Sequence, residues 1–173
     1  VSVRSETYLL VMKDLLRSML TCGARRVLVL NGHGGNHELN ELAVRDVARE
    51  QPEAAGIALA AGSWWTLAAP LLAAHERLAG VRVPGHAGQA ESAMMLALRP
   101  DRVRSELLPS RDNDPSLGTL IPGARIEGEV PWTRFDGYTD SPAAATVELG
   151  AELQDIAVAA VAGAVTRLAR AGA

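Results

Sequence analysis

The amino-acid sequence predicts a layered α/β fold with parallel strands, on the basis of three observations. The run Val27–Leu30 is continuously apolar, as in a strand that is buried on both faces. A glycine-rich turn follows, and then a segment from about His37 to Glu50 with apolar residues at helical spacing. A second apolar run begins at Gly56, so that strands and helices alternate along the chain.

The other elements follow from helical spacing and from turn residues. Between residues 101 and 142, prolines and Asp, Asn and Gly dominate, so little regular structure is expected there. We expect helices over residues 6–22 (with Ser5 as N-cap), 37–50, 66–78 (interrupted at Pro70), 92–98 and 143–171, and short strands around residues 119–121 and 124–126.

Length and composition indicate a single globular domain over residues 1–173. The chain is 48% apolar and 21% charged with a net charge of −3, which is typical neither of a disordered chain nor of a nucleic-acid-binding protein. Cys22 is the only cysteine, so an intrachain disulfide is excluded and a reducing compartment is expected. No signal peptide or apolar run of roughly 18 residues is recognised. We therefore expect a cytoplasmic protein without membrane or nucleic-acid partners.

His33 is the first candidate functional residue. It lies in a glycine-bracketed turn directly after the Val27–Leu30 strand, and the carboxyl ends of parallel strands are where α/β proteins bind ligands. Asn31 and Asn36 can hold this turn by hydrogen bonds, and Asn36 is a suitable N-cap for the next helix. A solvent-facing turn histidine is the alternative. Phosphate binding is disfavoured, because neither Gly-Lys-Ser/Thr nor GxGxxG is present.

His86 and Glu91 form the second candidate group. His86 precedes a helix and Glu91 lies in its first turns, so the pair can serve as a general acid or base with its partner, or as metal ligands. A capping carboxylate next to a surface histidine is the structural alternative. Asp136 and Asp140, in the turn-rich region, are lesser candidates.

The remaining polar and aromatic residues are interpreted more simply. Trp64 and Trp65 are expected to end the second strand, where adjacent side chains point to opposite faces, so at most one lines a pocket. Such a residue either packs in the core or stacks on a ligand. His37 and His75 are interpreted as surface residues, and Glu38 as an acid that stabilises its helix start.

At these residues the sequence resembles the creatininase family of metal-dependent amidohydrolases, which includes mycofactocin-associated and formamide deformylase-type members. The segments that match in order and spacing are Asn31–Asn36, Ser63–Trp65, His86–Ser92, Leu96–Pro100 and Gly137–Pro142. The resemblance implies a three-layer α/β/α sandwich with a mostly parallel central sheet. It also implies one or two divalent metals (Zn, Mn or Fe) and a homo-oligomer, often a hexamer.

The resemblance also implies roles for individual residues. His33 corresponds to a metal ligand, and His86 to the catalytic histidine that carries a proton to the leaving nitrogen. Glu91 corresponds to an acid that binds metal or partners that histidine. The positions expected to face the substrate are Trp65, Gly34 and Asn36.

This sequence departs from the family in three ways. Creatinine-hydrolysing members carry Tyr and a metal-binding Glu where this chain has Gly34 and Gly35, and a Trp where it has Arg82. The family's Glu-x-His…Asp ligand segment, which lies before the first matching strand, is not found, so we expect an N-terminally truncated family domain. With His33 and Glu91 alone, tight zinc binding is not expected.

The expected function is hydrolysis of a non-peptide or cyclic C–N amide bond in a small molecule, by water that a divalent metal activates. Creatinine is not the expected substrate, because the residues that would cover it differ. The alternative is a catalytically impaired homologue or fragment that acts as a binding or assembly subunit. A small-ligand or phosphate-binding module ranks third.

Overall fold

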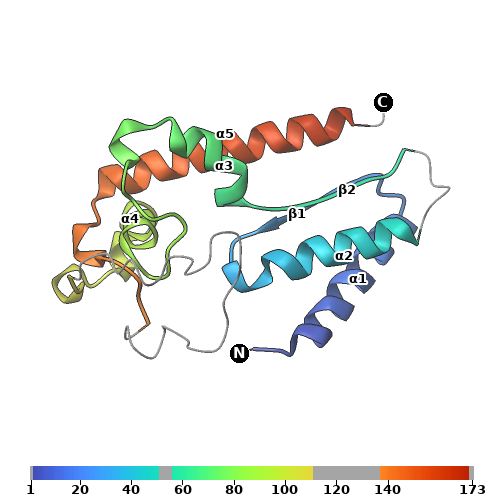
Figure 1. Cartoon of the computed structure of the whole chain (residues 1–173), viewed down its shortest axis with the longest axis horizontal. Helices are drawn as coiled ribbons and strands as arrows, with labels where there is room; N and C mark the ends of the chain where they lie inside the picture. The colour runs from blue at the N-terminus through green and yellow to red at the C-terminus, as the bar shows by residue number, and fades with distance from the viewer. Residues whose placement is uncertain (1, 51–55, 111–136, 172–173) are drawn as a thin grey trace, which may run out of the picture. The chain divides into compact units, whose positions relative to one another are not determined.

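The structure is a computed structural model that describes residues 2–50, 56–110 and 137–171 (Figure 1). It has a mixed α/β fold with parallel strands, as the sequence predicts. The helices and strands are α1 (Ser5–Thr21), β1 (Arg26–Asn31), α2 (His37–Arg49), β2 (Ala58–Ser63), α3 (Trp64–Ala73), α4 (Gln89–Leu98) and α5 (Val147–Arg170). The strands expected around residues 119–121 and 124–126 lie outside the described residues.

The chain divides into two compact units, which are described separately. The first contains Val1–Leu71 and Ala157–Ala173, and the second contains Leu72–Ile156. The prediction of a single domain stays a prediction.

The first unit is built around the parallel pair of β1 and β2. Their register places Arg26 opposite Ala58 at one end and Asn31 opposite Ser63 at the other. The connection between the strands runs through α2, as parallel pairing requires. Polar residues therefore stand opposite each other at the carboxyl ends of both strands, directly before the His33 turn and α3.

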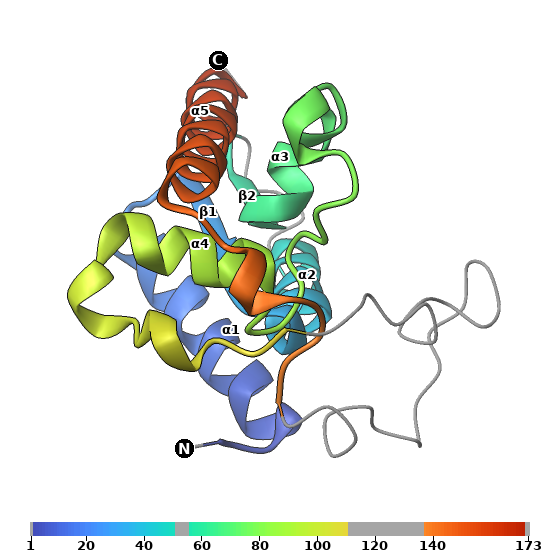
Figure 2. The same ribbon diagram turned by 90° about the vertical axis from the view of Figure 1, so that its left-hand side faces the viewer.

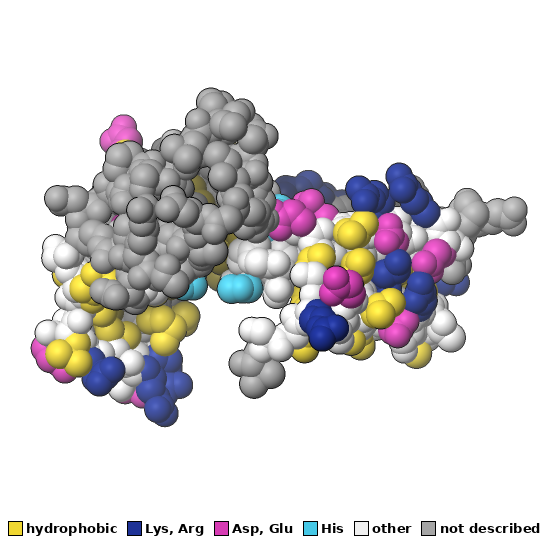
Figure 3. Space-filling view, turned by 60° about the horizontal axis from the view of Figure 1, so that its bottom comes forward, with side chains coloured by type: hydrophobic (Ala, Val, Ile, Leu, Met, Phe, Trp, Pro, Cys, Tyr) yellow, Lys and Arg dark blue, Asp and Glu magenta, His cyan; other side chains and the backbone are white. Residues whose placement is uncertain are grey.

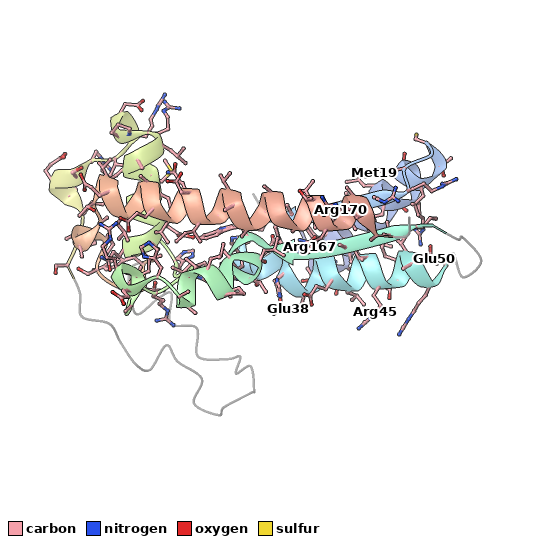
Figure 4. All side chains as sticks on the ribbon, turned by 90° about the horizontal axis from the view of Figure 1, so that it is seen from above. Met19, Glu38, Arg45, Glu50, Arg167 and Arg170 are labelled. Atoms are coloured by element: carbon pink, nitrogen blue, oxygen red, sulfur yellow. The ribbon has the colours of Figure 1, made fainter. Side chains whose placement is uncertain are left out.

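Helices cover the two faces of this strand pair (Figures 1 and 2). α1 and α2 lie on one face, and the part of α5 that belongs to the first unit lies on the other. A hydrogen bond of 2.9 Å from Arg26 Nε to the carbonyl of Ala171 ties the end of α5 to the start of β1. Arg167 and Arg170 lie in the last turn of α5 (Figure 4), where positive charge favours the helix dipole. The predicted layered arrangement is thus present in this unit.

The core of the first unit lies between α1, α2 and the strands. Its buried members come from α1 and α2: Leu16, Ala43, Val44 and Val47. Apolar side chains of both strands pack against them. α2 buries the face that its 3.6-residue spacing predicts, whereas α1 buries Leu16 and leaves Leu15 and Met19 exposed. Charged side chains surround this core, and Figure 3 shows acidic and basic residues interspersed with hydrophobic ones on one face of the molecule.

The second unit has a smaller core, formed by Leu78, Ala90 and Leu153. α4 and the first half of α5 approach closely at Gly150. A Cβ at this position would overlap the carbonyl of Ala93, so only glycine permits the contact. Gln154 Nε2 donates a 3.0 Å hydrogen bond to the carbonyl of Met94 and strengthens the same contact. This packing fixes the helix on which Glu91 lies.

The structure corrects one prediction that bears on function. Trp64 and Trp65 do not end a strand but begin α3, and their rings meet edge to face with centroids 5.9 Å apart. The strand ends earlier, at Ser63, so the alternation of neighbouring side chains does not apply to the tryptophans. α3 also continues past Pro70 to Ala73, where the sequence predicted an interruption.

α5 bears on the expectation that no segment could span a membrane. Of the described helices, it is the one long and apolar enough to do so by length and composition alone. The same test is passed by helices of soluble proteins, and α5 also carries buried and charged contacts. Leu153 is fully buried, and Glu152 forms an ion pair with Arg77. The apolar stretch of α5 is 17% buried, so burial does not identify it as a core helix.

Candidate functional site

The His33 turn lies at the carboxyl end of β1, as predicted. The strand ends at Asn31, His33 has an extended backbone, and a short 3-10 turn (Gly34–Asn36) leads into α2. The side-chain amide of Asn31 donates a 2.8 Å hydrogen bond to the carbonyl of His33, and its oxygen accepts one of 3.2 Å from the His33 N–H. Asn31 is 5% exposed whereas His33 is exposed, so a buried side chain holds the backbone of an accessible histidine.

Asn36 holds the turn differently from the prediction. It occupies the N-cap position of α2, but its side chain makes no capping hydrogen bond. Its backbone N–H instead donates to the carbonyl of His33 at 3.0 Å. The backbone is helical at Asn36, which explains why its side chain does not cap.

The two glycines after His33 have different surroundings. A Cβ on Gly35 would lie 3.2 Å from His33 Nε2, whereas one on Gly34 would meet nothing within 4 Å. The imidazole therefore rests against the backbone of Gly35. This position carries no side chain that could serve as a further metal ligand.

Ser63 and His37 were not predicted to have roles, and both contact this region. Ser63 is fully buried, and its hydroxyl lies 2.7 Å from Asn31 Nδ2 and 2.8 Å from His37 Nδ1. His37 was interpreted as a surface residue; its side chain is 26% exposed, and its Nδ1 faces Ser63 at the end of β2. The sequence alone could not indicate this contact. Asn31 and Ser63 lie opposite each other only because of the register between β1 and β2.

His86 lies in a tightly turned loop before α4. Gly85 and Ala87, on either side of it, both have positive φ values of 65° and 43°. The His86 N–H donates to Thr139 Oγ1 at 2.9 Å, and the Thr139 N–H donates to the carbonyl of His86 at 3.0 Å. The backbone of His86 is therefore clamped by a segment more than fifty residues later in the chain.

Asp140, a lesser candidate from the sequence, is the second residue that holds the His86 loop and the start of α4 in place. It is 2% exposed, and its Oδ1 accepts hydrogen bonds of 3.2 Å from the N–H of Gln89 and from the Thr139 hydroxyl. Gly88 leaves the space for this carboxylate, because a Cβ there would overlap it. The charge sits at the N-terminus of α4, where a helix stabilises an anion. Asp136, the other lesser candidate, lies outside the described residues.

Glu91 lies in the first turn of α4 and is half-buried. Its Oε2 accepts a 2.6 Å hydrogen bond from the N–H of Ala87. This contact ties the His86 loop to the start of α4. One oxygen of the Glu91 carboxylate therefore has the capping role that was the structural alternative. Its role in proton transfer or metal binding stays a prediction.

A hollow of about 430 Å³ opens beside Glu91 in the second unit. This volume falls within the range of small-molecule sites. Its wall combines apolar side chains with two arginines, and the lining residues are Ala87, Glu91, Ser92, Met95, Arg102, Val103, Arg104, Leu107 and Leu108. The predicted substrate-facing residues Trp65, Gly34 and Asn36 belong to the first unit.

The described donors do not by themselves fit the divalent metal that the resemblance implies. His33 belongs to the first unit and Glu91 to the second. Over residues 2–50, 56–110 and 137–171, no group of three or more His, Cys, Asp or Glu side chains lies close enough to hold an ion. Catalytic zinc sites use about three protein ligands. His33 is thus a single suitable donor and not a complete site.

Comparisons with known proteins agree with the sequence resemblance. The family model for creatininase, described as creatinine amidohydrolase, matches residues 1–165. A crystal structure of creatinine amidohydrolase superposes with a TM-score of 0.77 at 23% identity, over 96% of this chain and 65% of that one. A manganese creatininase and a mutant creatininase of Zn–Zn type superpose with TM-scores of 0.76 at 22% and 23% identity, each over 96% of this chain and 65% of theirs.

At such identities the superpositions establish the fold alone. The chain spans less than two thirds of the length of these solved structures. No curated protein sequence matches it.

Proposed function

Because the chain belongs to the creatininase family, we propose that the protein is a metal-dependent amidohydrolase that cleaves a non-peptide or cyclic C–N amide bond. The family match over residues 1–165 is the observation that carries this proposal. A divalent metal held by His33 together with further ligands would supply the positive charge that favours attack of water on an amide carbonyl. The proposal assigns this chain part of the binding and proton-transfer machinery.

His86 is proposed to move a proton to the leaving nitrogen. Its backbone is held on both sides, by the N–H and the hydroxyl of Thr139, so little freedom remains in the loop that presents the imidazole. Glu91 is proposed to partner this histidine, since its carboxylate already fixes the neighbouring Ala87. A preorganised acid–base pair of this kind contributes about 10²–10⁴-fold to the rate of such reactions.

His33 is proposed as a metal ligand in the whole protein. Its ring is exposed at a strand end, and Asn31 fixes its backbone by two hydrogen bonds. The described chain supplies too few neighbouring donors for tight binding, so His33 holds metal weakly without further ligands.

The proposed substrate is a small amide other than creatinine. The hollow beside Glu91 has room for a small molecule and offers both apolar and basic lining. Gly34 and Gly35 stand where creatinine-hydrolysing relatives are expected to carry bulky residues, and the space beside Gly34 is open. Trp65 and Asn36, which belong to the first unit, are proposed as substrate-facing positions on the family resemblance alone.

A panel of linear and cyclic amides, incubated with the protein and excess Zn²⁺ or Mn²⁺, tests this function. We expect release of amine or ammonia from at least one small amide, and loss of that activity with EDTA. If no amide is hydrolysed under any metal condition, the proposal fails.

A binding or assembly subunit is the second candidate. The lack of a three-donor group among the described residues favours it. A protein that assembles with copies of itself or a partner in solution, yet hydrolyses none of the panel, would support this alternative.

A further inference from the structure

Four polar side chains form a hydrogen-bonded relay at the carboxyl ends of β1 and β2: Asn31, Ser63, His37 and Glu41. Asn31 Nδ2 lies 2.7 Å from Ser63 Oγ, and Ser63 Oγ lies 2.8 Å from His37 Nδ1. On the far side of the ring, His37 Nε2 lies 3.3 Å from Glu41 Oε1. This relay thus connects the ends of both strands to the first turns of α2.

The hydrogen bonds of Asn31 fix the direction of this relay. Its Oδ1 must accept, because it faces the N–H of His33, so its Nδ2 donates to the carbonyl of His33 and to the Ser63 hydroxyl. A flipped amide would set two donors against each other. The contacts of the amide with the His33 backbone and with Ser63 are therefore satisfied together in one orientation.

The direction carries on to His37. Ser63 Oγ already accepts from Asn31, and its own hydrogen has His37 Nδ1 as an acceptor at 2.8 Å. In this arrangement Nδ1 is the acceptor and the neutral ring carries its hydrogen on Nε2, which faces the carboxylate of Glu41; in the opposite arrangement Nδ1 donates to Ser63. A second donor at Nδ1 would leave the hydrogen of the fully buried Ser63 without this acceptor.

We propose that Ser63 and His37 are positioning residues for His33. Their relay holds the Asn31 amide in the single orientation that ties down both the N–H and the carbonyl of His33. The backbone from which the imidazole projects is thereby fixed within an otherwise glycine-rich turn. That His33 then binds a metal rests on the proposed function; the positioning itself does not.

Burial argues that this network has a purpose beyond filling space. Ser63 is completely buried and Asn31 nearly so, and burying polar groups is unfavourable unless each one finds a partner. An alanine at position 63 would avoid that requirement. The relay retains polar groups at the strand ends and uses them on one target, the His33 backbone.

Amide hydrogen exchange at His33 tests the proposal in the protein itself. Ser63→Ala removes the link between Asn31 and His37, and we expect the His33 N–H to exchange about tenfold faster. His37→Ala should give a similar increase, whereas His37→Asn, which can keep an acceptor near the Nδ1 position, should restore protection. Unchanged exchange at His33 in Ser63→Ala would overturn the proposal.

Tyr8→Phe is the matched control. It removes another hydrogen bond of the same unit, 2.9 Å from Tyr8 to Asn40, without touching the turn. Exchange at His33 should stay at the wild-type rate in this variant. An increase equal to that of Ser63→Ala would mean that general loosening, and not the relay, controls the turn, and would also overturn the proposal.

Two further measurements complete the test. The first uses the wild-type protein, and the second separates the positioning of His33 from its proposed role as a metal ligand. Long-range ¹H–¹⁵N spectra of the wild-type protein should show His37 as the Nε2–H tautomer, and the Nδ1–H tautomer would contradict the relay. Zinc titration completes the test. Faster exchange in Ser63→Ala with unchanged zinc binding would support positioning and count against His33 as a ligand.

Discussion

The carboxylate of Glu91 accepts a 2.6 Å hydrogen bond from the backbone N–H of Ala87, the residue that follows the candidate catalytic histidine. Ala87 has a φ of 43°, which is uncommon for a residue with a side chain. The contact therefore stabilises an unfavourable backbone turn. It also places the predicted acid and the predicted proton carrier on one rigid loop–helix junction.

Two substitutions separate the capping and chemical roles of Glu91. Glu91→Gln keeps an oxygen that can accept from Ala87, so we expect the free energy of unfolding to change by less than about 1 kcal/mol. Hydrolysis should fall at least about 100-fold, because the charge is lost. Glu91→Ala should lower both. Full activity in a folded Glu91→Gln variant would restrict Glu91 to capping.

Gly88 and Asp140 are expected to be strongly coupled. Gly88→Ala places a methyl group on the Asp140 carboxylate and should destabilise the protein by several kcal/mol, since buried overpacking costs about 1–3 kcal/mol and a buried clamp is lost as well. Adding Asp140→Ala removes the obstructing atoms. Chemical denaturation of both single variants and the double variant should show a loss far smaller than the sum. Additive losses would contradict the close contact.

Gly34 and Gly35 offer a matched pair at the His33 turn. Gly35→Ala should displace the imidazole, because its Cβ would lie 3.2 Å from His33 Nε2, whereas Gly34→Ala meets open space. We expect the His33 ring resonances to shift and zinc binding to weaken in Gly35→Ala alone. Two-dimensional NMR spectra with zinc titration measure both effects. Equal responses of the two variants would contradict the described ring position.

Much of this arrangement could be predicted from the sequence, because it depends on local pattern. The Val27–Leu30 run gave β1, and the glycine-rich turn placed His33 at its end. The position of Glu91 in the first turn of α4 likewise needed only helical spacing and loop residues. The family resemblance added the expected chemistry and is supported by the family match.

The remaining features depend on contacts between distant segments. The pairing of Asn31 with Ser63 requires the register of two strands, and the Thr139 and Asp140 clamps reach His86 and Gln89 across more than fifty residues. The tryptophans were misassigned because a strand that runs directly into a helix has no turn residue to mark the boundary.

Acid should weaken the contact between α1 and α2. The hydrogen bond from Lys13 lowers the pKa of Asp46, and the bidentate contact with Arg17 lowers that of Glu50, from ordinary values of 3.8 and 4.5. A carboxyl group whose pKa is lowered in the folded protein stabilises the fold at pH values above its ordinary pKa. This stabilisation is lost as the pH falls through the pKa of the group in the folded protein. We expect urea midpoints to fall below about pH 4.

Arg17→Met is the control for that pH dependence. It removes the partner of Glu50, so the difference in urea midpoint between wild type and variant should be present at pH 7 and shrink toward pH 2. The Arg17–Glu50 pair is solvent-exposed, so the difference is expected to be small and to decrease further in high salt. A difference that is constant from pH 7 to pH 2 would contradict the ion-pair assignment.

The central claim is that His86 moves a proton during metal-dependent amide hydrolysis, and the rate of His86→Gln tests it most directly. The measurement uses an amide hydrolysed in the presence of excess Zn²⁺ or Mn²⁺, with His75→Gln as control, a half-buried histidine of the same unit. We predict that His86→Gln lowers kcat at least about 100-fold while His75→Gln stays near wild type. A folded His86→Gln variant with wild-type kcat would contradict the account.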